Sequence, residues 1–286
     1  MGQPRRISVV LRTAGERTCT ASLARFSAIS PTPVGVIKAS SVRDALSRSL
    51  SLHIQQHPEV AINVDADVLP TRNALRLAVD EFLAASPPAD VGYFRMLCSL
   101  HGGFAFVGTN LYRGSILSHA LDAAACLGES LRPDADAISV LRERGFRSVL
   151  FNTVLGVHDH EQYLRHVFVK MYNRARRSRS APYLRQRFAA LSEHDVESKA
   201  ALMGLTMGLE AADRWRLRST ATCRDVTRLL QEAGIRERAP LGEDWTGPTA
   251  EDLIASYKPT PQSVSWEATA RGVVLSYGQG MGEVVP

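Results

Sequence analysis

Three short β-branched runs near the start of the chain, separated by helix-like segments, constrain its fold more than any other feature. The runs are Ile7–Arg12, Val34–Lys38 and Ala61–Val64. A short helix-like segment lies between the first two, and a longer one that begins at Ser41 repeats apolar residues at helical spacing before the third. A β-α-β-α-β order of this kind predicts neighbouring parallel strands with right-handed crossovers, and therefore an α/β fold.

The rest of the chain divides near residue 180. Helix and strand signals alternate up to that point, whereas three helical segments and a tail with Pro, Gly and little periodicity follow it. We therefore expect one domain over residues 1–179 and a mainly helical region with an irregular tail over 180–286, with a boundary near 178–182. Further elements expected in the first domain are helices at 72–83, 115–127 and 132–144, strands at 104–107 and 147–155, and an amphipathic helix that begins at Tyr163.

Composition limits the class of protein without assigning a function. Hydrophobic residues make up 45% of the 286 residues and charged residues 22%, which is enough for a packed core. The formal net charge of +5, carried mostly by arginine, favours anionic partners. A genome that prefers arginine codons explains the excess of arginine over lysine at least as well. Four cysteines without C-x-x-C spacing fit reduced thiols, and no apolar run has the length of a signal peptide or a membrane span. We expect a cytoplasmic protein with at most peripheral membrane contact.

The pair Asp65 and Asp67, directly after the third β-branched run, is the sharpest chemical signal. Ligands on parallel sheets bind beyond the carboxyl ends of the strands, where this pair is expected to lie. Carboxylates two residues apart can face one site, and hard divalent cations prefer such oxygen ligands. A cation held there can bridge to a nucleotide diphosphate and neutralise charge on the departing diphosphate. A solvated acidic turn is the alternative, because D-x-D is common by chance.

Two other groups of polar residues are further candidates for chemistry. Arg12, Thr13 and Arg17 come after the first strand-like run and can hold a phosphate or a base. The segment 156–163, GVHDHEQY, places four titratable groups at the start of a helix, where a His can ligate a metal and an Asp or Glu can act as a base. A helix cap or a surface arginine is the simpler explanation for several of these residues. No G-x-G-x-x-G or P-loop pattern is present, which disfavours ordinary dinucleotide and P-loop sites.

In order along the chain, these motifs resemble those of bacterial glycosyltransferases of the GT-A fold, in particular the large inverting family that includes many polysaccharide synthases. The likeness covers roughly Ile7 to Arg179 and rests on R-T-x-x-E-R-T, a strand ending in Lys, D-A-D, G-x-x-L-Y-R, R-P and G-x-H-D-x-E-Q-Y. It implies a GT-A, Rossmann-like, mostly parallel sheet flanked by helices, followed by the helical C-terminal region. It also implies a divalent-metal-dependent, hexosyltransferase-like enzyme that transfers a sugar with inversion.

The resemblance also implies partners. The donor would be a nucleotide-diphosphate sugar, and the acceptor a saccharide, a lipid-linked molecule or a small molecule. Nucleic acid is not expected as a partner, and an oligomer is possible.

The same resemblance assigns roles to individual residues. It implies Mn²⁺ or Mg²⁺ at Asp65, Asp67 and His158, and a general base at Asp159 with Glu161 as the second candidate. Tyr112 and Arg113, which follow Gly108, are candidates for an acceptor pocket, although a plain loop-to-helix junction is equally credible. The implied nucleotide-sugar contacts are Arg12, Thr13, Arg17, Lys38, Asp65, Ala66 and Asp67.

The sequence departs from the family in two places. The acidic run that often follows the second strand is replaced by Lys38-Ala39-Ser40, so the nucleobase contacts are not assigned. The usual E-D base pair is replaced by H-D-H-E at 158–161, which weakens the choice of a base.

Two other functions stay open on the sequence. In a haloacid-dehalogenase-type phosphatase, Val64-Asp65-Ala66-Asp67-Val68 would match D-x-D-x-[TV] and Asp65 would be the nucleophile. That family also needs a later strand ending in G-D-x-x-x-D, which the sequence lacks. A non-catalytic protein of the same fold could instead bind a nucleotide or nucleic acid, as the arginines suggest. The chain contains no helix-turn-helix, zinc-finger or aromatic-basic RNA motif.

Overall fold

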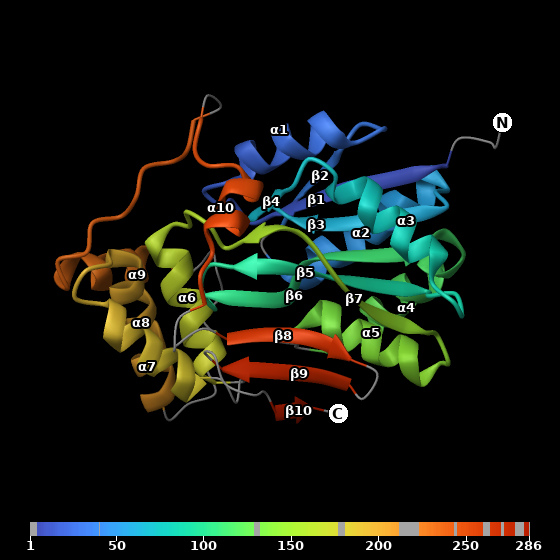
Figure 1. Ribbon diagram of the computed structural model, residues 1–286. Coiled ribbons are helices and arrows are strands. Elements are labelled where there is room, and N and C mark those ends of the chain that lie inside the picture. Colours follow the sequence, from blue (N-terminus) through green and yellow to red (C-terminus); the bar gives the residue numbers. More distant parts are fainter. Residues whose placement is uncertain are drawn as a thin grey trace.

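A seven-stranded sheet with helices on both faces forms the centre of the protein (Figure 1). The computed structural model describes residues 5–39, 41–128, 132–176, 181–211, 223–242, 245–259, 264–269, 272–277 and 283–285. The strands of the main sheet are β1 (Ile7–Thr13), β2 (Gly35–Lys38), β3 (Val60–Asp65), β4 (Val68–Pro70), β5 (Val91–Cys98), β6 (Gly103–Arg113) and β7 (Ser148–His158).

The order of strands in this sheet is β2-β1-β3-β6-β5-β7-β4. β2, β1 and β3 run parallel as predicted, and β5 is parallel to β7. The pairs β3–β6, β5–β6 and β4–β7 are antiparallel. The predicted α/β class with flanking helices is therefore confirmed, and the sheet is mixed, with parallel and antiparallel pairs in equal number.

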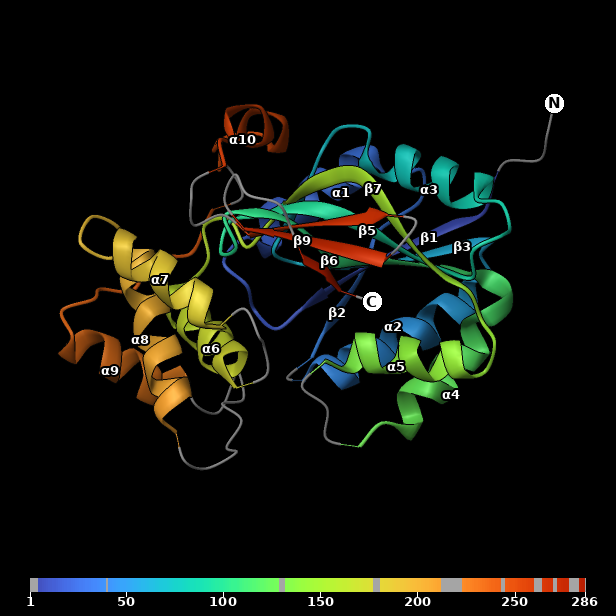
Figure 2. The ribbon, with the colours of Figure 1, turned by 60° about the horizontal axis from the view of Figure 1, so that its bottom comes forward.

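Two layers of helices cover the sheet, one on each face (Figure 2). Before residue 180 the helices are α1 (Cys19–Ile29), α2 (Val42–Gln56), α3 (Ala74–Ala84), the 3₁₀ turn η1 (Gly114–Ile116), α4 (Leu117–Cys126), α5 (Pro133–Glu143) and α6 (Leu164–Ala175). On one face α1 and α3 enclose an apolar cluster in which Phe94 stacks on Phe151, with ring centroids 4.7 Å apart. On the other face α2, α4 and α5 enclose a second cluster built around Leu46, Leu50 and Leu141. Alternation along β1 explains the two layers, because Val9 belongs to the first cluster and Val10 faces α2.

The C-terminal region adds α7 (Ala181–Leu191), α8 (Val196–Glu210), α9 (Cys223–Glu232) and α10 (Ala250–Ser256), as well as a small antiparallel sheet of β8 (Val264–Thr269), β9 (Gly272–Tyr277) and β10 (Glu283–Val285). The helical character expected beyond residue 180 is present. Part of the tail that was expected to be irregular is the β8–β9–β10 sheet, whose first strand lies beside β6.

Helix α6 packs closely on α8. Gly204 lies against the backbone oxygen of Phe168, and Gly208 one turn later lies against that of Tyr172, so a side chain at either position would clash. A shared apolar cluster joins β5 and β6 to α6, α7 and α8. Residues 177–180, where the domain boundary is predicted, lie outside the described residues, and the two-domain division stays a prediction.

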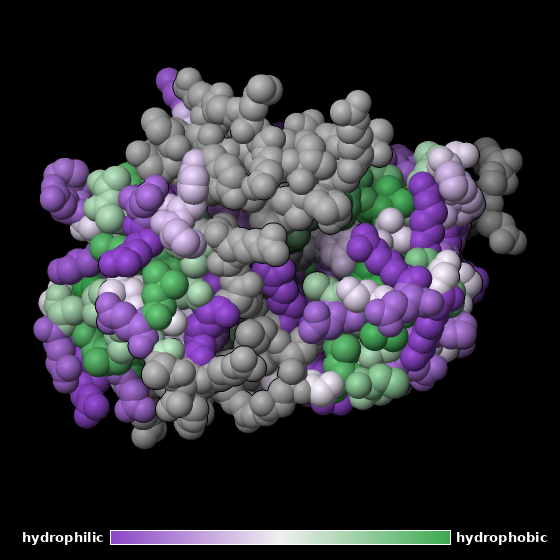
Figure 3. Space-filling view, turned by 90° about the horizontal axis from the view of Figure 1, so that it is seen from below, coloured by the Kyte–Doolittle hydropathy of each residue, from purple (hydrophilic) through white to green (hydrophobic). Residues whose placement is uncertain are grey.

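On the face seen in Figure 3, the described surface mixes polar and apolar side chains. Among the helices that the structure describes, none is both long and apolar enough to cross a membrane. The described exposed large apolar side chains are Val36, Val42, Leu191, Val196, Met207 and Leu209.

Candidate functional site

The carboxyl ends of β1, β3, β5 and β7 meet at one edge of the main sheet. Arg12 at the end of β1 is in register with Asp65 at the end of β3, and Cys98 at the end of β5 is in register with His158 at the end of β7. Asp67 follows in the turn between β3 and β4, and its backbone oxygen accepts a hydrogen bond of 3.1 Å from the amide of Asp159. The sheet thus brings together the D-x-D pair and the first half of the 158–161 motif, which are far apart in sequence.

Asp65, Asp67 and His158 form a group that fits a hard divalent cation. One ligand atom from each lies within 4.8 Å of the others. Asp67 is 4% exposed, and among the described residues its Oδ1 has no hydrogen bond, only an ion-pair contact of 3.4 Å with His158 Nε2. A buried carboxylate oxygen that lacks a hydrogen bond is a favourable ligand for a cation or a water. Two carboxylates and an imidazole are suitable ligands for Mn²⁺ or Mg²⁺, so the predicted ligand set is assembled in one place.

Arg12 holds Asp65 in position. Its Nη2 donates to Asp65 Oδ1 over 2.6 Å and its Nε over 3.2 Å, while Nη1 donates to Asp134 Oδ1 over 2.5 Å. Asp134 lies in the first turn of α5, and the Arg12 side chain is almost fully buried between the two carboxylates. Since both contacts with Asp65 go to Oδ1, its second oxygen is the one suited to a metal. Arg12 was predicted to contact the nucleotide, and its observed contacts are with these carboxylates.

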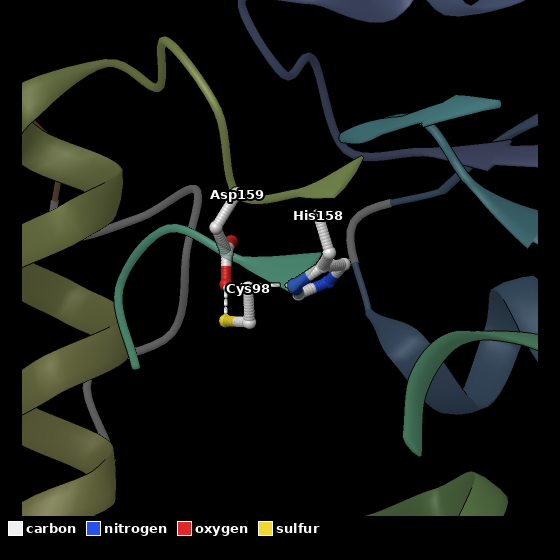
Figure 4. A group of neighbouring side chains, drawn as sticks. All are labelled: Cys98, His158 and Asp159. Atoms are coloured by element: carbon white, nitrogen blue, oxygen red, sulfur yellow. Dashed lines mark hydrogen bonds and ion pairs between the residues drawn. The ribbon is translucent and has the colours of Figure 1, made fainter. Parts of the chain in front are cut away.

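His158 lies between the D-x-D pair and Asp159. Its Nδ1 is 2.8 Å from Asp159 Oδ2, which also accepts a 3.5 Å hydrogen bond from the Cys98 thiol (Figure 4). Burial alone would lower the pKa of His158, but Asp159 and Asp67 outweigh it and raise that pKa well above its ordinary value. The two ring nitrogens face carboxylates on opposite sides. Because the raised pKa favours the protonated ring, a cation that binds at Nε2 must displace a proton.

Asp159 is fully engaged by its neighbours. Its backbone is left-handed, with φ of 63°, and its Oδ1 pairs with the ammonium of Lys170. Burial would raise the pKa of Asp159, but His158 and Lys170 outweigh it and hold the pKa well below its ordinary value. A carboxylate with a low pKa and both oxygens occupied is a weak general base, which disfavours the role that the resemblance gave it.

Lys170 is a member of the site that the sequence analysis missed. Its ammonium, on α6, contacts both Asp67 Oδ2 and Asp159 Oδ1. Burial would lower the pKa of Lys170, but the two carboxylates raise it well above its usual range, so the side chain stays charged. The available sequence signals were that Lys170 is one of only four lysines and follows the buried Val167 at helical spacing.

The turn after β1 and the turn after β7 are tied together at the rim of the site. Arg17 Nη1 donates to Glu161 Oε2 over 2.5 Å and to the backbone oxygen of Glu161 over 3.2 Å. Thr18 Oγ1 donates to the backbone oxygen of Ala66 over 3.0 Å, which anchors the first turn to the D-x-D turn. The Glu161 side chain is 38% exposed, so it remains accessible from outside, unlike Asp159.

Thr13 and Glu16 shape the turn after β1. Thr13 Oγ1 donates to Glu16 Oε2 over 2.7 Å and accepts from the amide of Gly15 over 2.9 Å. The amide of Ala14 also donates to Glu16 Oε2, over 2.9 Å. Burial and the negative charge of the neighbouring Asp67 raise the pKa of Glu16.

The other predicted residues lie outside this cluster. Lys38 is exposed at the end of β2, in register with Thr13, whereas the Ala66 side chain is fully buried and only its backbone can take part in binding. Tyr112 and Arg113 pair with the first residues of β3, at the end of the strand opposite Asp65. Tyr112 is buried in the cluster under α2, α4 and α5, and Arg113 donates to the backbone oxygen of Ala89. The geometry therefore does not favour an acceptor role for these two residues.

Comparison with known proteins gives a distant structural resemblance. No family model matches the chain, and no curated protein matches its sequence. The mannosyltransferase PcManGT from Pyrobaculum calidifontis, in complex with GDP-Man and Mn²⁺, is 15% identical, with 88% of this chain and 79% of that chain covered and a TM-score of 0.41. Glucosyl-3-phosphoglycerate synthase from Mycobacterium tuberculosis, in complex with Mg²⁺ and UDP, is 14% identical, with 73% and 81% covered and a TM-score of 0.37.

A glycosyltransferase involved in glycosylation of the major capsid of PBCV-1 is 13% identical, with 51% of this chain and 82% of that chain covered and a TM-score of 0.38. The solved structures found in this way include nucleotide-sugar transferases and related nucleotidyltransferases. Because these TM-scores are below 0.5 and the identities are low, a function for this chain has to be argued from the site itself.

Proposed function

We propose that the chain is a glycosyltransferase that uses a nucleotide-diphosphate sugar and a divalent cation held by Asp65, Asp67 and His158. The observation that carries the proposal is the buried Oδ1 of Asp67, which has no hydrogen bond among the described residues and faces His158 Nε2 beside Asp65, at the carboxyl edge of the sheet. A cation bound there supplies charge neutralisation for the departing diphosphate. The acceptor stays open and includes saccharides, lipid-linked molecules and small molecules.

The surrounding residues have separate roles in this proposal. Arg12 fixes the orientation of Asp65 through its two contacts with Oδ1. Asp159 is a positioning residue for His158, because its Oδ2 lies 2.8 Å from Nδ1 and a partner of this kind orients a ligating imidazole. Glu161 is the better candidate for the general base, since it lies at the rim and is reachable by an acceptor hydroxyl. Arg17 would hold that carboxylate in place.

Donor recognition would come from the turn after β1. The Thr13 hydroxyl and the amides of Ala14 and Gly15 bond to one another and to Glu16 within this turn, and Lys38 lies beside it at the end of β2. Cationic side chains such as Lys38 are suitable partners for phosphate oxygens, and the turn amides would have to leave their present acceptors to bind one. The phosphatase alternative also needs a later strand that ends in G-D-x-x-x-D, which the sequence lacks.

A donor-hydrolysis screen tests the proposal. Purified protein is incubated with a panel of nucleotide-diphosphate sugars and Mn²⁺ or Mg²⁺, and release of the nucleoside diphosphate is measured. We expect one donor class to be hydrolysed, and Asp67→Asn to reduce the rate by about 100-fold or more. Asp80→Asn on α3, whose side chain is 48% exposed, is the control and should have the wild-type rate.

Three results would speak against the proposal. Hydrolysis that is unaffected by Asp67→Asn would remove the D-x-D pair from the chemistry. Binding of a nucleotide diphosphate without any metal dependence or turnover would favour the non-catalytic alternative. A phosphorylated Asp65 detected by mass spectrometry would favour the phosphatase.

A further inference from the structure

Lys170 occupies a place in the site that a simple metal-ligand description does not explain. Within the described part of the chain, Asp67 forms ion pairs only with His158 and Lys170, and Asp159 does the same. Arg12, another cation near the site, is already shared between Asp65 and Asp134. Lys170 is the lysine whose ammonium pairs with both Asp67 and Asp159.

The burial of the three side chains is unequal. The carboxylates of Asp67 and Asp159 are each 6% exposed, whereas the side chain of Lys170 is 33% exposed. Lys170 thus reaches from the surface of α6 into a buried pair of carboxylates. A lysine has a flexible stem and a strongly hydrated head, so it can withdraw towards solvent, which the buried carboxylates cannot do.

The position of Lys170 also conflicts with a divalent cation. Its ammonium donates a hydrogen bond to Asp67 Oδ2, and Asp67 is one of the three residues proposed as metal ligands. Two like charges a few ångströms apart in a partly buried site repel strongly. A bound divalent cation therefore weakens the ion pair between Lys170 and Asp67, and this ion pair in turn weakens the binding of the cation.

We propose that Lys170 is an internal counter-cation of this site: it holds Asp67 and Asp159 in place when no divalent cation is bound, and it leaves Asp67 for the donor diphosphate when one is. This inference rests on the proposed function. Lys170 would stay near the site through Asp159, where its charge can then be used by phosphate oxygens. It is a positioning residue in the ion-free protein and a donor-binding residue in the loaded one.

The consequence is a competition between two cations for one carboxylate. In Lys170→Met the competitor is removed, so Mn²⁺ should bind more tightly in the absence of nucleotide, by about tenfold or more, which corresponds to about 1.4 kcal/mol. The ion-free variant should unfold at a lower temperature than wild type, because two buried carboxylates lose a partner. Saturating Mn²⁺ should raise the unfolding temperature of the variant by more than it raises that of wild type.

The effect on nucleotide binding should have the opposite sign. At saturating Mn²⁺, Lys170→Met should bind a nucleoside diphosphate more weakly than wild type, since a phosphate contact is lost. A residue that merely braces α6 would lower stability without tightening the binding of Mn²⁺. The opposite signs of the two changes therefore separate the proposed role from a structural one.

The experiment is a titration of Mn²⁺ followed by electron paramagnetic resonance at constant pH, with thermal unfolding alongside. Lys170→Arg keeps the charge and should resemble wild type, whereas Lys170→Gln should resemble Lys170→Met and serves if the Met variant does not fold. Lys199→Met is the matched control, because Lys199 is an exposed lysine on α8 that contacts only the backbone oxygen of Ala233 among its described hydrogen bonds.

The possible failures can be distinguished. If Mn²⁺ binds wild type, Asp67→Asn abolishes that binding, and Lys170→Met leaves the affinity unchanged or weaker, the counter-cation role is wrong and the proposed function survives. If neither wild type nor Lys170→Met binds Mn²⁺ through Asp67, both the metal site and this inference are wrong.

Discussion

Gly108 offers a way to disturb His158 without changing any charge. It lies at an irregularity in the pairing of β6 with β5 and has a left-handed backbone, with φ of 74°. A Cβ at this position would lie 2.7 Å from Cδ2 of His158 and 2.6 Å from Cγ2 of Val68. Ordinary contacts of this kind are 3.4–4 Å, so the ring of His158 or the strand would have to move by about 0.7 Å.

A displacement of this size matters for a metal ligand. Metal–ligand distances tolerate errors of only about 0.2 Å. We therefore expect Gly108→Ala to weaken Mn²⁺ binding by about 10- to 100-fold, the range found when the groups that orient a ligand are changed. This corresponds to about 1.4–2.7 kcal/mol of binding free energy. The left-handed backbone should cost about a further 1 kcal/mol of folding stability.

Gly234→Ala is the matched control for the backbone effect. Gly234 has φ of 73°, and a Cβ there would meet nothing within 4 Å. Both variants should lose stability through backbone strain, and Gly108→Ala should lose more because its Cβ also meets His158 and Val68, as measured by denaturant unfolding. Only Gly108→Ala should lose Mn²⁺ affinity, as measured by calorimetric titration. Equal Mn²⁺ affinity in the two variants would refute the reasoning that His158 is a ligand held in place by the space at Gly108.

The remaining predictions concern stability. Burial lowers the pKa of His53 from 6.5 to about 4, so the unfolded chain takes up a proton first as the pH falls. The stabilisation that the neutral His53 provides is present above about pH 6.5 and is lost as the pH falls towards 4. Between pH 7 and 5, the free energy of unfolding should therefore drop by about 2 kcal/mol more in wild type than in His53→Gln. An equal drop in the two proteins would contradict this. Glu237 accepts hydrogen bonds from the amides of Leu164 and Arg165 at the start of α6, so Glu237→Ala should lower the free energy of unfolding by about 1 kcal/mol in a urea titration. The exposed Glu232→Ala should change it by less than about 0.5 kcal/mol, and a similar loss in both variants would contradict the capping role.

The parallel part of the sheet could be predicted because its sequence is locally distinctive. β1, β2 and β3 are short β-branched runs, and the helix expected to begin at Ser41 is α2, which the Ser41 hydroxyl caps by accepting from the amide of Asp44. β5 was not predicted, and β6 is longer than expected. β5 pairs on both sides and is nearly buried throughout, so it lacks the alternation that identifies a strand with one exposed face. Its antiparallel pairing with β6 depends on contacts that no local pattern encodes.

The candidate site was predictable to a similar extent. Asp65 and Asp67 could be placed at a strand end from the buried run before them, and only the resemblance suggested that His158 joins them. The structure brings the three together, while their roles remain a proposal. Lys170 could not be found from the sequence, because periodicity does not tell whether a lysine beside a buried helix face points to solvent or into a site. Tyr112 and Arg113 shared a motif with the site but lie at the other end of β3, since β6 is antiparallel to it.

The central claim is that Asp65, Asp67 and His158 hold a divalent cation next to the donor diphosphate. Crystals grown with Mn²⁺ and a nucleoside diphosphate, measured at the manganese absorption edge, test it directly. The account predicts an anomalous peak within coordination distance of all three side chains, with the diphosphate bound to the same ion and no peak in Asp67→Asn. Bound nucleotide with no peak at these side chains, or manganese bound elsewhere, would contradict it.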